Sequence, residues 1–199
     1  VQQLSDEPLT EAYKSYKKAL ELDEKGRFDN SLKVKLTLLT NDLTNQAVKA
    51  FNDSDYKKAL TSFEQILDIQ SIDMIKADSP NSIDTVIIYN AGLAAYNAKD
   101  YDKAIDVYQK VEDKYGINEE TSIQKHKVYL LQNDQEKAIA EIEKLVIAFP
   151  TEPQYHSMLA ELYMASGQTV KALSSYNRVL ELDPGNPYIH ISLSDYYRK

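Results

Sequence analysis

Small and apolar residues recur along the second half of the chain with a period of about 34 residues. Ala172, Tyr176 and Val179 are spaced i, i+4 and i+7, which places them on one face of a helix. The helix breaker Pro184 follows them. The positions one and two periods earlier again hold a small residue, two apolar residues and a breaker: Ala138, Ile142, Leu145 and Pro150, then Ala104, Tyr108, Val111 and Gly116. Self-similarity at this period predicts a helical repeat architecture.

A second helical pattern precedes these helices. Leu159, Ala160 and Tyr163 share one face at the spacing i, i+1 and i+4, and the positions two units earlier hold Ala91, Gly92 and Ala95. A short polar turn stands between the two patterns, and it reads Asp55-Tyr56, Asp100-Tyr101, Asp134-Gln135 and Gly167-Gln168. An Asp at this point can cap the second helix by accepting hydrogen bonds from its free N–H groups. Each unit is therefore predicted to be a helix, a tight turn and a second helix.

Two further copies lie in the first half of the chain. One carries Ala59, Phe63 and Ile66, and its distance to the next copy exceeds the period by about 11 residues, which are therefore inserted between them. The other begins with Ala12, Tyr16 and Ala19. Residues 27–39 are also extra. Their leucines predict that the first helix of the following unit extends well beyond the roughly 20 residues of a long globular helix: Leu32, Leu36 and Leu39.

The composition agrees with a helical chain and excludes several kinds of chemistry. The sequence has no Cys, so it has no disulfide scaffold, no cysteine-based zinc site and no thiol nucleophile. Only 5 Gly and 6 Pro argue against an all-β protein, whose tight turns consume both residues. The net charge of −8 argues against a broad surface for nucleic acid or anionic membrane. No apolar run is long enough for direct membrane insertion.

The repeat resembles the tetratricopeptide repeat (TPR), whose pattern is W-x₂-L-G-x₂-Y, then A-x₃-F, then P, over about 34 residues. Residues 153–186 are similar to it at seven positions: Leu159, Ala160, Tyr163, Gly167, Ala172, Tyr176 and Pro184. Residues 40–73, 85–118 and 119–152 match at fewer positions, and the resemblance covers roughly the whole chain. It implies an all-α fold, a right-handed solenoid or superhelix of antiparallel pairs of helix A and helix B. The concave face of such a superhelix is made mainly by helix A.

The resemblance also implies a division of the chain, with residues 1–199 forming a single TPR solenoid. The expected parts are a lone helix B at 8–25, a repeat with an extended helix A at 28–73, an inserted loop at 74–84, full repeats at 85–118, 119–152 and 153–186, and a half repeat at 187–199. The abundant Tyr residues, 15 in all, are expected to fill the spaces between helices.

Departures from the family pattern mark individual helices. Lys125 and His126 replace the usual Leu-Gly pair, so helix A of 119–152 is expected to pack differently or to be partly exposed. His156 and His190 occupy the place of the family's packing aromatic. Neither has a ligand partner at i+3 or i+4, so packing is favoured over zinc binding.

No catalytic, cofactor or metal site is predicted. A Gly-rich phosphate loop, a nucleophile elbow and an H-E-x-x-H motif are all missing from the sequence. Asp53, Asp55 and Glu64 imitate a calcium loop, but Lys58 occupies the place that needs Gly. The sequence therefore favours a protein that is not an enzyme.

Family resemblance places a peptide-binding groove on the helix A residues. The polar candidates are Thr44, Asn45, Asn52, Tyr89, Asn90, Asn97, Gln124, Lys127, Gln154, Ser157 and Glu161. Apolar neighbours are Val48, Phe51, Leu93, Tyr96, Ile123, Leu130, Leu131, Met158 and Met164. Such a lining suits an extended or helical segment with apolar anchors, its backbone bonded by the amides. For Leu93, Tyr96 and Leu130, packing between repeats is an equally good interpretation.

The sequence thus predicts a non-catalytic scaffold that binds a peptide or protein partner, and no nucleic acid. The set of groove cations needed to hold a chaperone's C-terminal carboxylate is missing. The alternative is an assembly or regulatory TPR region of a larger multidomain protein, outer-membrane-associated or enzymatic, with self-association through the open helical ends. The chain also resembles TPR regions of exported bacterial proteins, which favours a periplasmic or exported location over a cytoplasmic one.

Overall fold

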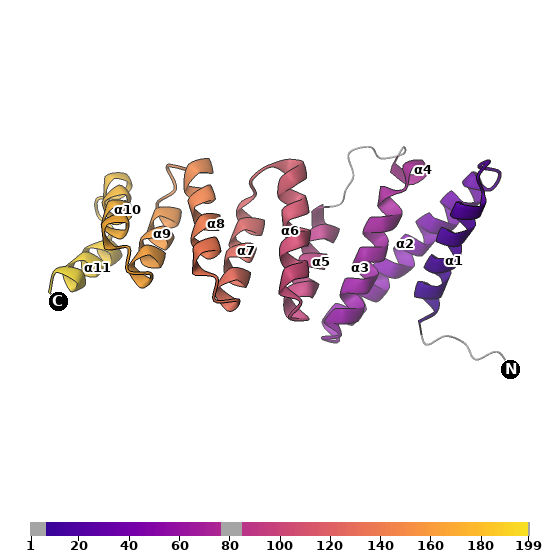
Figure 1. The fold of residues 1–199 in the computed structure, drawn as a ribbon, viewed down its shortest axis with the longest axis horizontal. Coiled ribbons are helices and arrows are strands. Elements are labelled where there is room, and N and C mark those ends of the chain that lie inside the picture. Colours follow the sequence, from indigo (N-terminus) through magenta and orange to yellow (C-terminus); the bar gives the residue numbers. More distant parts are fainter. Residues whose placement is uncertain (1–6, 77–84, 199) are drawn as a thin grey trace. The chain divides into compact units, whose positions relative to one another are not determined.

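A computed structural model of the chain describes residues 7–76 and 85–198, and in these ranges it contains helices and no strand (Figure 1). The helices are α1 (Pro8–Leu22), α2 (Asp29–Asn52), α3 (Tyr56–Ser71), α4 (Asp73–Lys76), α5 (Thr85–Asn97), α6 (Tyr101–Tyr115), α7 (Glu119–Leu131), α8 (Gln135–Ala148), α9 (Pro153–Ala165), α10 (Thr169–Leu182) and α11 (Pro187–Tyr197). The predicted all-α fold of paired antiparallel helices is confirmed.

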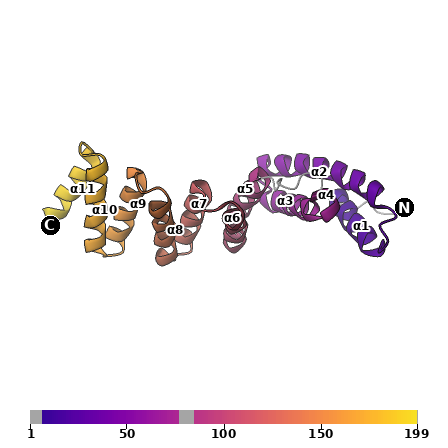
Figure 2. The same ribbon diagram turned by 90° about the horizontal axis from the view of Figure 1, so that it is seen from above.

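The chain divides into two compact units, Val1–Val107 and Tyr108–Lys199, and the boundary falls within α6. In unit 1, α2 and α5 lie on one side and α3 on the other; in unit 2, α7 and α9 lie on one side and α8 on the other (Figure 2). These are the helix A and helix B layers that the repeat pattern predicts. That residues 1–199 form a single solenoid stays a prediction.

Each turn between helix A and helix B has the same backbone conformation. One residue of every turn adopts a left-handed φ of 58–75°, and these residues are Ser54, Lys99, Asn133 and Gly167. The N–H of the next residue then donates to the carbonyl five residues back, as in the 2.8 Å bond from Gln168 to Tyr163. This arrangement satisfies carbonyls that the end of helix A would otherwise leave unpaired.

The predicted Asp caps are present in three of these turns. The carboxylates of Asp55, Asp100 and Asp134 accept from the N–H three residues later, at 3.1–3.3 Å. In the fourth turn Gln168 makes no side-chain capping bond. The cap therefore follows the residue type that the sequence provides.

Helix lengths confirm one expectation and differ from another. Helix α2 has 24 residues, as its extra leucines predict. The segment 74–84 is predicted to be a loop, yet α4 forms a helical turn over Asp73–Lys76. The first-turn carboxylate of Asp73 stabilises the N-terminal end of this turn, and Met74 and Ile75 are half-buried. Residues 77–84 of the predicted loop lie outside the described residues.

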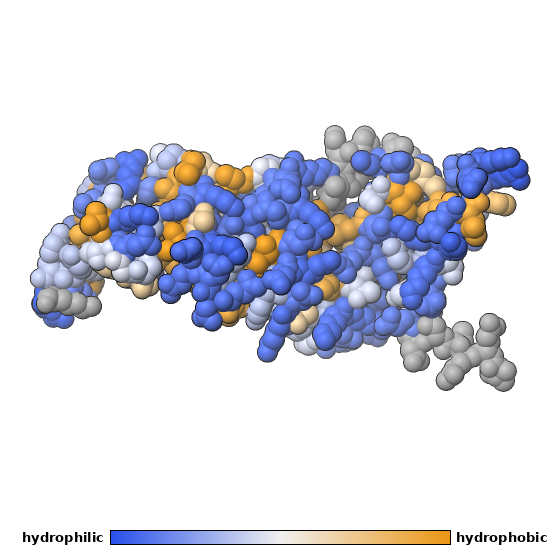
Figure 3. Space-filling view, in the orientation of Figure 1, coloured by the Kyte–Doolittle hydropathy of each residue, from blue (hydrophilic) through white to orange (hydrophobic). Residues whose placement is uncertain are grey.

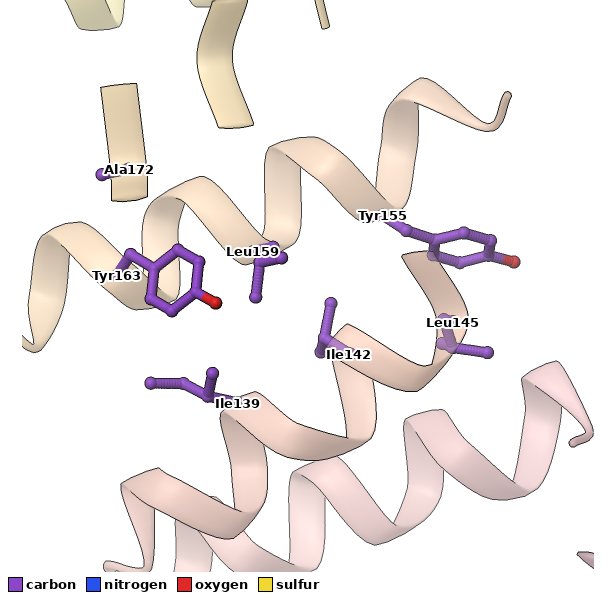
Figure 4. Packing of buried hydrophobic residues seen from close by; sticks show 7 residues of the cluster. All are labelled: Ile139, Ile142, Leu145, Tyr155, Leu159, Tyr163 and Ala172. Carbon is purple, nitrogen blue, oxygen red and sulfur yellow. The ribbon is translucent and has the colours of Figure 1, made fainter. Parts of the chain in front are cut away.

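The core of unit 2 is built as the repeat pattern requires (Figure 4). Ile139, Ile142 and Leu145 of α8 face the next helix A, whose contributing residues are Tyr155, Leu159 and Tyr163. Ala172 of α10 completes the cluster, and its small side chain lets α10 approach α9 closely. Since a single hairpin cannot bury both of its faces, this packing against the neighbouring hairpin supplies the stability of the stack.

Candidate functional site

The helix A residues of unit 2 share one face of that unit. Tyr188 of α11 donates a hydrogen bond from its hydroxyl to Oε1 of Glu161 on α9, at 2.7 Å. Counted along the repeat, Tyr188 holds the second position of its own repeat, and Glu161 holds the ninth position of the preceding repeat. The pair one repeat earlier is Gln154 and Lys127. The hydrogen bond to the carboxylate raises the pKa of Tyr188.

The predicted groove residues of unit 2 are accessible to different degrees. Lys127, Gln154 and Glu161 are exposed, while Gln124 and Ser157 are half-buried. Among the apolar neighbours, Leu130 is 40% exposed and Leu131 50%, so packing does not account for Leu130. Met158 and Met164 are partly buried against the core cluster. We define the helix A face of unit 2 by its three polar and two apolar exposed members on α7 and α9: Lys127, Gln154, Glu161, Leu130 and Leu131.

The predicted groove residues of unit 1 divide into two groups. Thr44 and Asn97 bond to carbonyls of their own helices, at 2.8 Å in each case, so their polar groups are already partnered. Asn45 and Asn52 are exposed, and the half-buried members are Tyr89 and Asn90.

Ring packing decides the role of two apolar neighbours in unit 1. Phe51 packs edge-on against Tyr56 at a centroid distance of 5.3 Å. Tyr96 packs against Tyr101 at 6.1 Å. Both pairs join the same two repeat positions across the turn between helix A and helix B. Tyr96 is thus a packing residue, which is one of the two interpretations that the sequence left open for it, the other being groove lining.

An exposed stripe on α2 was not predicted from the sequence. Val34 is 60% exposed and Leu38 59%, and both lie in the extended part of the helix. Together with Asn41, Asn45 and Val48 they follow an alternating spacing of four and three residues, which defines one helix face. That spacing was visible in the sequence, but the buried leucines of the same segment dominated the pattern.

A buried ion network replaces the family's Leu-Gly pair in unit 2. The side chain of Lys125 is fully buried, and its Nζ lies 2.6 Å from Oε2 of Glu112 on α6 and 3.2 Å from Oε2 of Glu141 on α8. Its Nζ also donates to Oε1 of Gln109 at 2.9 Å. The expectation that this helix packs differently is confirmed, because three partners surround the ammonium group of Lys125.

Glu112 and Glu141 have further partners in the network. Glu112 accepts from Ser122 Oγ at 2.9 Å and from Thr121 Oγ1 at 3.2 Å. Lys144 donates to Oε1 of Glu141 at 2.9 Å, so two lysines balance two glutamates. A closed and neutral set of this kind serves packing, since its central ammonium is not accessible to a substrate.

The histidine rings lie at hydrogen-bond distance from backbone carbonyls of loops or neighbouring helices. Nδ1 of His126, which is buried, lies 2.9 Å from the carbonyl of Ala138. His156 and His190 each place Nε2 3.0 Å from the carbonyl of a proline six residues earlier. The packing role is confirmed for His156, whereas His190 is exposed. Within the described ranges no three His, Asp or Glu side chains are grouped so that they could hold a metal ion.

One face of the molecule is mostly polar. The face drawn in Figure 3 carries mainly hydrophilic residues, and its hydrophobic residues lie in separate groups. Among residues 7–76 and 85–198, no helix has both the length and the apolar character needed to cross a bilayer.

The fold and this face define a class of protein, the α-helical repeat proteins whose hairpins share a fixed turn and pack on their neighbours. Sequence profiles described as tetratricopeptide repeat match residues 95–162 and 153–186. Residues 95–186 of the chain thus carry tetratricopeptide repeats. No curated protein sequence matches it.

Solved structures share the fold at low sequence identity. A tetratricopeptide repeat protein from Parabacteroides merdae is similar with a TM-score of 0.58 and 15% identity, covering 76% of this chain and 56% of that one. MamA from Desulfovibrio magneticus is similar with a TM-score of 0.53 and 19% identity, covering 92% and 99%. YrrB is similar with a TM-score of 0.51 and 16% identity, covering 94% and 84%.

Proposed function

We propose that the protein is a non-catalytic scaffold that binds a peptide or protein segment on its helix A residues. The observation that carries this proposal is the helix A face of unit 2, where Leu130 and Leu131 are exposed beside Lys127 and Glu161. Apolar anchors next to a few directed polar groups are typical of peptide-binding surfaces. YrrB, which shares the fold, is described as a TPR protein with an unusual peptide-binding site.

The test compares two exposed apolar residues of unit 2. Leu131→Glu places a charge on the helix A face, and Ile147→Glu places the same charge on helix B, where Ile147 is 77% exposed. Proteins captured from the source cell by the wild type are expected to be lost with Leu131→Glu and retained with Ile147→Glu. Equal retention by both variants, with circular dichroism showing both folded, would refute binding at this face.

A second candidate function is self-association through α11. Ile191 is 61% exposed there and Tyr197 73%, so this helix presents exposed apolar side chains. Light scattering is expected to show a concentration-dependent increase in mass that Ile191→Glu abolishes. A constant monomer mass for the wild type would exclude this candidate.

A further inference from the structure

Three charged residues form a ladder across unit 2. Lys127 on α7, Glu161 on α9 and Asp195 on α11 are each one repeat period apart, so they occupy the same position of three successive A helices. All three are exposed. The ladder therefore runs from one positive to two negative side chains.

The three charged residues of the ladder differ in whether they already have a hydrogen-bond or ion-pair partner. Glu161 accepts one hydrogen bond from Tyr188, and Asp195 lies 3.5 Å from a guanidinium nitrogen of Arg198. Lys127 has no ion-pair partner in the part of the chain that the structure describes. The ammonium group of Lys127 is therefore available to form an ion pair with an acidic group of a segment bound at this face. The carboxylate of Glu161 is held in place by Tyr188 and still has accepting capacity.

Apolar surface lies beside these charges. Leu130 and Leu131 follow Lys127 on α7, and half-buried Met158 precedes Glu161 on α9. A segment that crosses this face from α7 to α9 therefore meets an ammonium group and a carboxylate, each with apolar side chains beside it. Opposite charges at such a surface fix register and orientation more than they raise affinity.

We infer, on the basis of the proposed function, that this face selects an extended segment of mixed charge. An acidic residue of the segment lies at Lys127, a basic residue lies at Glu161, and apolar residues lie between them. Tyr188 on α11 reaches Glu161 on α9, so successive A helices are about 10 Å apart, as packed helices are. An extended segment in the polyproline II conformation advances about 3.1 Å per residue and has three residues per turn, so its side chains at i and i+3 lie on the same side. The acidic and basic residues are therefore about three positions apart. The ladder does not suit a segment rich in acidic residues, since Glu161 and Asp195 repel it.

Five labelled peptides of equal length test this selection. They differ only at two positions, i and i+3, which flank two leucines. These two positions carry Glu and Lys, Lys and Glu, Glu and Glu, Lys and Lys, or Gln and Gln. Fluorescence anisotropy at about 50 mM salt, where exposed charges are weakly screened, gives their affinities. At least one mixed peptide is expected to bind about fivefold more tightly than Glu/Glu and Lys/Lys, since each exposed ion pair contributes a factor of about two to five.

Charge reversal on the protein tests the location. Lys127→Glu makes the ladder wholly acidic and is expected to shift the preference to Lys/Lys, whereas Glu161→Lys is expected to shift it to Glu/Glu. Lys137→Glu is the matched control, because it makes the same change at an exposed residue of α8 and is expected to leave the order unchanged.

The outcomes separate this inference from the proposed function. Equal binding of all five peptides, reduced by Leu131→Glu, would overturn the charge selection and leave peptide binding at the face intact. A preference that neither Lys127→Glu nor Glu161→Lys changes would also overturn it. If the wild type binds none of the five peptides, both the selection and the binding of short segments at this face are wrong.

Discussion

Lys125→Met is expected to destabilise unit 2 strongly. Methionine keeps the length of the side chain but removes the ammonium group that lies 2.6 Å from Glu112 and 3.2 Å from Glu141. Two buried carboxylates then face each other, and removing one partner of a buried ion pair costs about 3–5 kcal/mol. Because Lys144 remains 2.9 Å from Glu141, the lower end of that range applies. A loss of about 3 kcal/mol is a large part of the roughly 5–15 kcal/mol that stabilises a typical domain.

Urea unfolding followed by circular dichroism measures this loss. At a slope of about 2 kcal/mol per molar urea, the midpoint is expected to fall by about 1.5 M. Lys127→Met is the matched control, since it makes the same change two residues along α7 at an exposed site and is expected to alter stability by less than about 0.5 kcal/mol. Hydrogen exchange is expected to locate the lost protection in α7 and α8.

A triple variant separates the ion pair from other effects of the substitution. Replacing Lys125 by Met together with Glu112→Leu and Glu141→Leu removes all three central charges at once. Buried ion pairs replaced by apolar residues of similar volume often retain or gain stability, so most of the loss is expected to be recovered. Equal midpoints for Lys125→Met and Lys127→Met would refute the assignment of Lys125 to a buried network.

Three further substitutions test single features of the repeats. Gln168→Asp supplies the missing cap of α10, and we expect thermal unfolding to show a gain of about 1 kcal/mol. Lys99→Gly relieves a left-handed residue at φ 63°, and the urea midpoint is expected to rise by the equivalent of about 0.5–1 kcal/mol. Burial and the hydrogen bond to Glu143 raise the pKa of Tyr163 to about 12, above its ordinary value of 10. Its contribution is therefore complete below pH 10 and lost as the pH rises toward 12, so urea unfolding between about pH 9 and 11.5 is expected to show a smaller decrease for Tyr163→Phe than for the wild type.

The repeat fold follows from local sequence features. Each hairpin needs a small residue where helices approach, and Ala138 and Ala172 occupy such a place with no exposed surface. Each turn has one left-handed residue, which is followed directly by an Asp cap in three of the four turns. Because the same requirements recur in every repeat, several concordant copies outweigh the poor match of any one of them.

The buried network was not predictable because its partners are distant in sequence. Lys125 contacts Glu112 on the preceding helix and Glu141 on the following one, more than three helical turns away along the chain in each direction. The repeat pattern shows only that the usual Leu-Gly pair is absent, and a lysine by itself favours exposure. The predicted binding residues met the same limit, since the bonds of Thr44 and Asn97 to their own helices depend on side-chain rotamers.

One repeat later, the same three places carry different chemistry. The equivalents of Glu112, Lys125 and Glu141 in the next repeat are Val146, Leu159 and Ser175, and Val146 packs against the core cluster that contains Leu159. The backbone accepts either set because each leaves no buried charge without a partner and each fills the space between the hairpins. The repeat period therefore constrains the volume and the hydrogen bonding at a position, while its polarity can change from repeat to repeat. The same freedom applies to the exposed ladder, where one position is Lys127 in one repeat and Glu161 in the next. The repeat pattern thus determines which positions of the A helices are exposed, and the residues of this chain determine the charge that each of these positions carries.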